Sequence, residues 1–186
     1  MEPRIELAFA NREQLGVEIL APAYYGARHV NLRGRNPIRT PQDLNGLRLR
    51  MPGGESGQFL GQAIGATPMP VAYAETYAAL QTGVIDGQDT PLPNNRLMSL
   101  HALTDQIVLT RHNIGFGMLI IRKALFDELS PDQQARMRTA AEAAFAWSTA
   151  EYLRQEEELI GFSAMPGLMS MSPISRPFRP RRRRNI

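Results

Sequence analysis

The stretch "GATPMPVAYAETYAALQTGVIDGQDTP", residues 65–91, carries the strongest local signals in the sequence. Its prolines keep the "TPMPV" segment extended, because proline disfavours helix at its own position and at the one before it. Residues 74–82 then form a good helical segment, and Gly83 is the residue type expected just past a helix end. The next residues, "VID", are expected to form a short strand, and "DGQDTP" is expected to be a polar turn. The stretch therefore predicts a strand–helix–strand unit that ends in clustered acidic and amide side chains.

Outward from this stretch, local patterns predict alternating strands and helices. "LRLRMP" alternates apolar residues with arginines, which is the period of a strand with one covered face. Thr40, Pro41, Asp43 and Gly46 mark the two ends of a short helix. The other strands are expected at residues 17–26, 106–112 and 114–122, with Asn113 near the junction of the last two. The other helices are expected at residues 3–15, 55–64, 93–102 and 130–159.

The last of these helices has a capping box at its start, formed by Ser130 and Gln133. Its packing side is expected to carry Met137, Ala140, Ala141, Ala144 and Trp147.

Length and composition limit the classes of protein. A chain of 186 residues with 43% hydrophobic content suits one domain or two small lobes. The absence of cysteine excludes disulfides, thiolate metal sites and cysteine nucleophiles. No apolar run approaches the roughly 20 residues needed to span a bilayer, and no secretory signal precedes the first segment. As written, the chain is expected to stay in the cytoplasm.

The net charge of +3 comes from the end of the chain, because residues 163–186 hold six arginines and no acid. The rest has 15 basic residues against 18 acidic ones. Composition predicts that this Pro/Arg-rich tail is disordered. Its abrupt onset after a long helix supports the hypothesis that it is translated out of frame.

Three motifs, in this order and spacing, resemble one family. They are "DLNGLRLRMP" (residues 43–52), the opening stretch and "LTRH" (residues 109–112), and "ELSPDQQ" (residues 128–134) also matches. The sequence resembles the solute-binding proteins of TRAP transporters, the tripartite ATP-independent periplasmic carriers, over about residues 24–160.

The resemblance implies an α/β fold of the two-lobed, periplasmic-binding-protein-like kind that closes over a small organic acid. The usual family chain is longer, so this chain is expected to be incomplete. It would hold mostly the second lobe, with a return segment and a long helix of the first. The expected parts are residues 1–23 (connecting helix and strand), 24–112 (ligand-binding second lobe), 113–162 (return strand and long helix) and 163–186 (tail).

The same resemblance implies a dicarboxylate-receptor type of protein that is periplasmic when complete, with integral-membrane TRAP permease subunits as partners. No cofactor and no metal are expected. Self-association is expected through apolar surface left uncovered on residues 114–125 and on the long helix.

Arg50 matches the family's arginine that pairs with the ligand carboxylate. A guanidinium offers two parallel N–H donors to the two carboxylate oxygens and stays charged at any working pH. The alternative is an exposed strand arginine paired with Asp43 or Asp86. Arg48 lies two residues away on the same face and is interpreted as a solvated charge.

Four further residues complete the candidate site: Arg28, Tyr73, Thr90 and Asn94. Arg28 matches a second arginine found in part of the family, and an ordinary surface role remains the alternative. Tyr73 stands where the family places an aromatic residue against the ligand, and strand-to-helix packing is its alternative.

Thr90 departs from the family's usual asparagine, and Asn94 or Asn95 are candidates to compensate, unless both are helix-start residues. Gln88 and Asp89 are interpreted as scaffold. His112 is either a structural histidine at a strand end, which is favoured, or a pH-sensitive ligand group.

Other functions have weaker support. No glycine-rich phosphate loop, catalytic histidine arrangement or HExxH motif is present, which argues against an enzyme. A degenerate, non-binding fragment of a receptor is the main alternative. Nucleic-acid binding depends on "RPFRPRRRR" in the tail alone.

Overall fold

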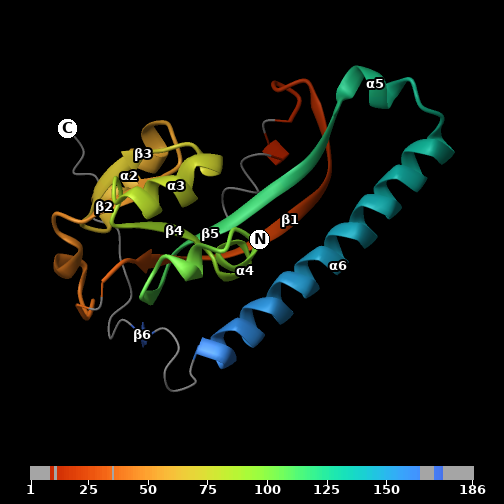
Figure 1. The fold of residues 1–186 in the computed structure, drawn as a ribbon. Helices are drawn as coiled ribbons and strands as arrows, with labels where there is room; N and C mark the ends of the chain where they lie inside the picture. The colour runs from red at the N-terminus through yellow and green to blue at the C-terminus, as the bar shows by residue number, and fades with distance from the viewer. Residues whose placement is uncertain (1–8, 11, 35, 164–169, 174–186) are drawn as a thin grey trace. The chain divides into compact units, whose positions relative to one another are not determined.

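The computed structural model describes residues 9–10, 12–34, 36–163 and 170–173, and the tail and the first expected helix lie largely outside them. The strands are β1 (Val17–Leu32), β2 (Arg48–Met51), β3 (Thr67–Pro70), β4 (Gly87–Pro91), β5 (Gln106–Arg122) and β6 (Ser170–Pro173). The helices are η1 (Pro41–Leu44), α2 (Glu55–Ala63), η2 (Tyr73–Glu75), α3 (Thr76–Thr82), α4 (Leu92–Leu97), η3 (Leu100–Ala102), α5 (Lys123–Asp127) and α6 (Pro131–Ser163). The strands form a sheet in the order β3-β2-β4-β1-β5-β6 (Figure 1). The expected α/β class is confirmed.

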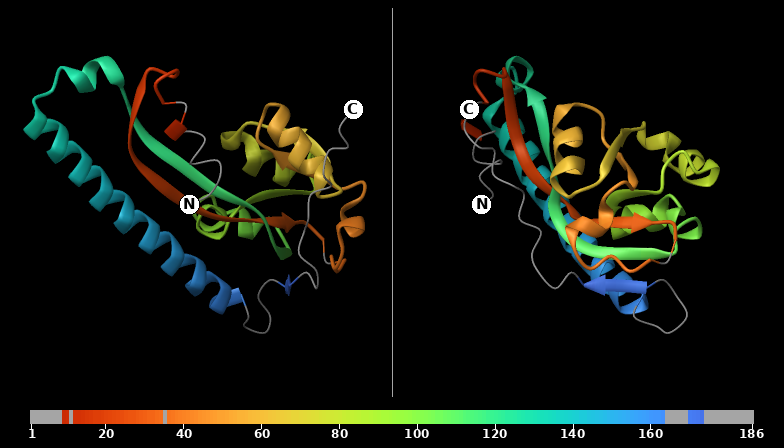
Figure 2. Two further views of the ribbon diagram at one scale, coloured as in Figure 1. Left: turned by 180° about the vertical axis from the view of Figure 1, so that it is seen from behind. Right: turned by 90° about the vertical axis from the view of Figure 1, so that its left-hand side faces the viewer.

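The chain divides into two compact units. Unit 1 takes the residues up to Tyr25 and Gly115–Arg154, and unit 2 takes Gly26–Ile114 and the residues from Gln155 onward. The two long strands β1 and β5 each pass through both units and are neighbours in the sheet (Figure 2).

Unit 2 contains the parallel part of the sheet. Strand β2 pairs in parallel with β3 and β4, and β1 pairs with β4 in the antiparallel direction. Helix α2 packs on β2 and β3. The core of this part consists of apolar side chains from β1, η1, β2, β5 and the connecting loops: Val30, Leu32, Ile38, Leu44, Leu49, Met51, Ile64, Ala66 and Val108. This core fixes the strands whose ends carry the candidate site.

The helix ends that the capping residues predict are present in the structure. The Asp43 carboxylate accepts the backbone N–H of Thr40 at 2.8 Å at the start of η1. Gly83 ends α3 with φ 74°, a left-handed conformation that glycine adopts without steric cost. At α6, the Ser130 N–H donates to Gln133 Oε1 at 2.9 Å, and the Gln133 N–H donates to Ser130 Oγ at 3.3 Å. These predictions are confirmed.

The expectation of a turn at "DGQDTP" is wrong. Gly87–Pro91 is a strand, and all five of its residues are buried. The sequence of β4 is polar and has little strand propensity, but β2 and β1 supply backbone partners on its two sides. Tertiary pairing therefore overrides local preference in this segment.

The expected break at Asn113 is also absent, because residues 106–122 form the single strand β5. The irregularity lies two residues earlier, at Arg111, where φ is 44°. A non-glycine residue in this region is uncommon and marks a local distortion of the strand.

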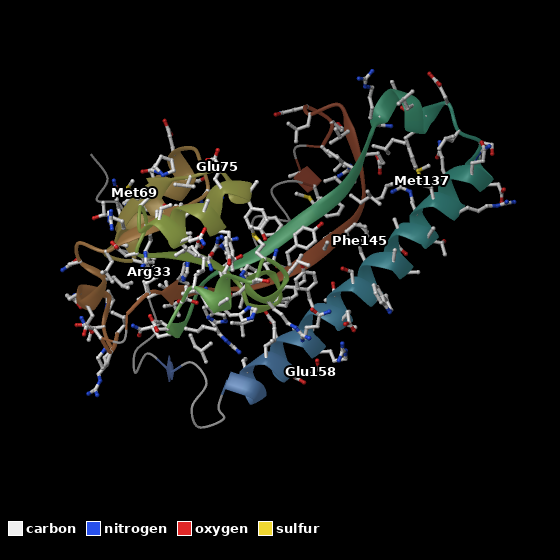
Figure 3. The ribbon with its side chains drawn as sticks, in the orientation of Figure 1. Arg33, Met69, Glu75, Met137, Phe145 and Glu158 are labelled. Atoms are coloured by element: carbon white, nitrogen blue, oxygen red, sulfur yellow. The ribbon has the colours of Figure 1, made fainter. Side chains whose placement is uncertain are left out.

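The core of unit 1 lies between β1, α5 and α6. Leu20, Ala21, Phe126 and Ala141 are buried there, and Met137 and Phe145 pack against them. Figure 3 shows the side chains of Met137 and Phe145 on the same side of α6.

Three of the residues expected on the packing side of α6 do not lie there. Ala140 and Ala144 are exposed, and Trp147 is 70% exposed. The packed side follows the spacing of Met137, Ala141 and Phe145, which leaves these residues on other sides of the helix.

Candidate ligand-binding site

The candidate site lies at one edge of unit 2, at the carboxyl ends of its parallel strands. Arg50 is the penultimate residue of β2, Thr90 is the penultimate residue of β4, and Tyr73 follows the end of β3 by three residues. In open α/β sheets this edge is the usual place for ligands. The fold therefore carries three of the five predicted residues to the same edge.

Within the part of the chain that the structure describes, Arg50 is held in place without an ion-pair partner. The residue is only 6% exposed, and its Nε donates to the Val71 carbonyl oxygen at 2.9 Å. Among the described residues, no partner is found for its two Nη groups. Burial lowers the pKa of Arg50 and the nearby Asp89 carboxylate opposes this shift, but a guanidinium remains protonated at neutral pH. Two charged donor groups are thus left available for an anion.

Tyr73 and Asn94 lie together with Arg50. The Arg50 guanidinium carbon is 5.6 Å from the centroid of the Tyr73 ring, within the range of a cation–π contact. Asn94 Nδ2 donates to the Tyr73 hydroxyl at 3.2 Å, which connects the start of α4 to the aromatic ring. The structure therefore brings three of the predicted site residues into one cluster.

Arg28 is engaged by a carboxylate of the protein. Its Nε lies 2.6 Å from Asp89 Oδ2, and its Nη2 donates to Asp89 Oδ1 at 2.9 Å and to the Asp89 carbonyl oxygen at 2.7 Å. The Asp89 side chain is fully buried, whereas that of Arg28 is 18% exposed. Burial by itself raises the pKa of Asp89, but hydrogen bonds from Arg28 and His112 outweigh it and hold the pKa at about 2. The charge of Arg28 is therefore offset within the protein.

His112 and His29 lie beside this ion pair. His112 Nε2 is 3.3 Å from Asp89 Oδ2, and its Nδ1 is 2.6 Å from Thr110 Oγ1. The backbone N–H of Arg111, the residue with a positive φ in β5, donates to His29 Nδ1 at 3.4 Å. The unusual backbone conformation of Arg111 therefore accompanies a hydrogen bond to the buried histidine. Burial, together with the charges of His112 and Arg111, lowers the pKa of His29 to about 4. His29 is therefore neutral at physiological pH.

Asp86 and Asp43 both have other partners. This excludes the alternative in which Arg50 is an exposed strand arginine paired with one of them. Arg48, not Arg50, binds Asp86, through Nη2–Oδ1 at 2.6 Å and Nε–Oδ2 at 3.0 Å. Asp43 accepts backbone N–H groups near η1. Arg48 was expected to be a solvated charge, and the structure places it in a partly exposed ion pair.

Of the five predicted site residues, Thr90 makes the fewest side-chain interactions within the described part of the structure. It is buried and lies opposite His29 in the β1–β4 register. No hydrogen bond of its hydroxyl is found within the described part of the chain.

A shallow surface pocket of about 290 Å³ lies elsewhere on unit 2, beside Arg33, which is labelled in Figure 3. Arg33 Nη1 already donates to the Leu80 carbonyl oxygen at 2.8 Å. Within the described ranges, no group of His, Cys, Asp and Glu side chains is arranged to hold a metal ion.

Comparison with protein families decides the class of the protein. Residues 4–180 match the family of bacterial extracellular solute-binding proteins, family 7. This chain belongs to that family. The resemblance to TRAP solute-binding proteins is thereby confirmed, and the family is one of solute-binding proteins rather than enzymes.

Individual relatives agree with the family. The chain is 30% identical over 156 residues to the sialic acid-binding periplasmic protein SiaP of Vibrio cholerae, covering 84% of this chain and 48% of that protein. It is 35% identical over 135 residues to the 2,3-diketo-L-gulonate-binding periplasmic protein YiaO of Escherichia coli, covering 72% of this chain and 41% of that protein. The chain thus spans about half the length of these curated relatives or less.

Solved structures support the same fold. A TRAP periplasmic solute-binding protein from Roseobacter denitrificans with bound 3-deoxy-D-manno-oct-2-ulosonic acid superposes with a TM-score of 0.85 at 40% identity. The match covers 93% of this chain and 58% of that one. A second protein from this organism, with bound β-D-glucuronate, gives a TM-score of 0.83 at 26% identity, covering 93% and 57% of the two chains. Within the described residues of the present chain, no helix is both long enough and apolar enough to cross a membrane.

Proposed function

We propose that this chain is a periplasmic receptor component that binds a hydroxylated organic acid through one carboxylate and delivers it to a TRAP-type permease. The observation that carries the proposal is Arg50, a buried residue whose two guanidinium Nη groups have no partner among the described residues. A carboxylate matches these two donors in geometry and in charge.

Charge balance at the site favours one carboxylate over two. Arg28 is neutralised by Asp89, and Arg48 by Asp86. Arg50 has no carboxylate at ion-pair distance in the described part of the chain. Among these three arginines of the described residues, none is left to pair with a second carboxylate of the ligand. A monocarboxylate is therefore the better fit, in place of the dicarboxylate suggested by the family type.

The other groups of the cluster favour a polar ligand body. The Tyr73 hydroxyl and the Asn94 amide lie on the same side as Arg50, and both can exchange hydrogen bonds with ligand hydroxyls. The ligands bound to related proteins, such as 3-deoxy-D-manno-oct-2-ulosonic acid and glucuronate, are carboxylic acids with several hydroxyl groups. Periplasmic location and a permease partner are proposed from the family.

A thermal-shift panel tests this function. The acids are 3-deoxy-D-manno-oct-2-ulosonic acid, D-glucuronate, D-galacturonate and L-galactonate, with succinate as the dicarboxylate and glucose as the uncharged control. At 100 times its dissociation constant, a ligand should stabilise the protein by about 2.7 kcal/mol. Stabilisation by a hydroxylated monocarboxylate, and not by glucose, supports the proposal. If no acid shifts the melting temperature, the alternative of a non-binding fragment is favoured.

A further inference from the structure

Three amide side chains form a buried cluster next to Arg50. Asn31 on β1, Gln88 on β4 and Asn95 on α4 are each at most 2% exposed, and we call them the amide cluster. Gln88 lies opposite Asn31 in the antiparallel β1–β4 pair and opposite Arg50 in the parallel β2–β4 pair. Residues in register on neighbouring strands point to the same face of a sheet. Arg50, Gln88 and Asn31 therefore follow one another across one face.

Hydrogen bonding within the amide cluster is incomplete. Asn95 Nδ2 donates to Asn31 Oδ1, and Asn31 Nδ2 donates to the His29 carbonyl oxygen at 3.1 Å. Two atoms are left over, the Gln88 Nε2 donor and the Asn95 Oδ1 acceptor. Both are buried, and neither has a partner among the described residues. A buried polar group without a partner costs free energy and calls for an explanation.

The two unpaired atoms match one chemical group. A hydroxyl can accept a hydrogen bond from Gln88 Nε2 and donate one to Asn95 Oδ1, whereas a carboxylate only accepts and an ammonium only donates. We propose that the amide cluster is a hydroxyl-binding subsite beside Arg50, and that the ligand is a hydroxy acid whose hydroxyl lies close to the carboxylate. This inference rests on the proposed function, because Arg50 places the carboxylate.

Both atoms are enclosed, so a ligand hydroxyl reaches them only when the amide side chains adjust. Gln88 carries a flexible side chain, and Asn94, next to Asn95, contacts Tyr73 at the cluster around Arg50. A ligand that contacts Tyr73 and Asn94 therefore acts directly on the start of α4. A water molecule has the same hydrogen-bonding capacity as a hydroxyl, and the experiment must separate the two.

The test compares pairs of acids that differ in one hydroxyl. Calorimetry is carried out with 3-deoxy-D-manno-oct-2-ulosonic acid and its 2-deoxy analogue, and with L-galactonate and its 2-deoxy analogue. The wild-type protein should bind at least one hydroxy acid about 100-fold more tightly than its deoxy partner, because a site built to bind a hydroxyl rejects the analogue that lacks it. Gln88→Met should lower the affinity for that hydroxy acid at least tenfold and leave the affinity for the deoxy acid unchanged.

Gln58→Met is the matched control. Gln58 Nε2 is a second buried amide nitrogen without a partner in the described residues, but it lies on α2 and not in the amide cluster. Its replacement should not change the preference between the acids. Melting temperatures report whether each variant folds, and Gln88→Met should not lower the value, since it removes an unpaired donor.

Two results would overturn the subsite. One is a wild-type protein that binds the members of each pair equally or binds neither hydroxy acid. The other is Gln88→Met weakening both members of a pair alike, as expected if the cluster only holds a structural water. Arg50→Gln separates this inference from the proposed function. If Arg50→Gln no longer binds either acid, the carboxylate site is supported. If it binds both acids as tightly as the wild type does, the proposed function is contradicted, even where the preference for the hydroxy acid remains.

Discussion

Arg28 and Asp89, which are 61 residues apart in the chain, form an ion pair with contacts of 2.6 and 2.9 Å in the interior of unit 2. Arg28 matches a ligand-binding arginine found in part of the family, but its charge is already offset by Asp89 in this structure. The pair also allows a strand with an aspartate at its centre to lie between two others. Of the two arginines, Arg50 is the one without an ion-pair partner among the described residues.

Breaking this pair should destabilise the protein. Asp89→Asn leaves the Arg28 charge without its partner in a largely buried place, and the loss is expected to be about 3 kcal/mol in urea unfolding. Lys123→Gln is the control, because the Lys123–Asp127 pair is exposed on both sides. Its loss should stay below about 0.5 kcal/mol. Equal effects of the two substitutions would contradict a structural role for the buried pair.

Stability should fall with acidification because of His29. Its pKa is about 4 in the folded protein against an ordinary value of 6.5, so between these values the unfolded chain binds more protons. The contribution of neutral His29 is complete above pH 6.5 and is lost as pH falls to about 4, a difference of about 3 kcal/mol. Asp89, with a pKa of about 2, adds its own loss only at lower pH.

The measurement is urea unfolding between pH 7 and pH 4.5 for the wild type and His29→Gln. The wild type should lose more stability over this range than the variant. Identical dependence of stability on pH in the two proteins would refute the assignment of this loss to His29.

Gly26 should not tolerate a side chain. Its φ is 94°, and an added Cβ would lie 2.7 Å from the Pro91 Cβ and 2.8 Å from Glu156 Oε1. The Glu156 carboxylate accepts the Ala27 N–H at 2.7 Å, so it cannot withdraw without losing that bond. Gly26→Ala is expected to cost more than about 2 kcal/mol, because steric overlap adds to the backbone strain of about 1–2 kcal/mol.

Gly16→Ala provides the comparison for Gly26. Gly16 also has a positive φ, of 63°, but nothing lies within 4 Å of its added Cβ. The loss of stability in Gly16→Ala should therefore come from backbone strain alone. Equal losses of stability at the two positions would show that the contacts of Gly26 carry no cost.

Unit 1 should associate with other copies of the chain. Ile120, Leu125 and Trp147 are each at least half exposed in this unit. Sedimentation velocity is expected to show a concentration-dependent dimer or larger species. Replacing the three together (Ile120→Thr, Leu125→Gln, Trp147→Gln) should restore the monomer, whereas Leu97→Gln in unit 2 should not. A wild-type protein that remains a monomer at high concentration would rule out the association.

Local chemistry made much of the fold predictable. The capping positions at Thr40, Gly83 and Ser130 mark real helix ends, because the backbone groups at each end find partners within the same turn. The alternation in β2 correctly places Leu49 and Met51 in the core. Family motifs singled out Arg50 and Tyr73, and Asn94 was a candidate to compensate for the departure at Thr90. The structure brings these three residues together.

What depends on distant partners could not be predicted. Strand β4 has a polar sequence, and only its neighbours β1 and β2 make it a strand. Asp89 was interpreted as scaffold, because nothing near it in sequence identifies Arg28 as its partner. The amide cluster likewise joins Asn31 to Gln88 and Asn95 across more than 50 residues, and no local pattern signals it.

The most direct test of the central claim is the calorimetric affinity for the best acid of the panel in Arg50→Gln and Arg48→Gln. The two arginines lie on the same strand, but Arg48 is engaged by Asp86, whereas no partner is found for the Arg50 Nη groups among the described residues. Loss of a charge-assisted hydrogen bond of about 1.5–3 kcal/mol should weaken binding by about 10- to 150-fold in Arg50→Gln. Arg48→Gln should bind as the wild type does. Undiminished affinity in Arg50→Gln, or equal losses in both variants, would contradict the carboxylate site.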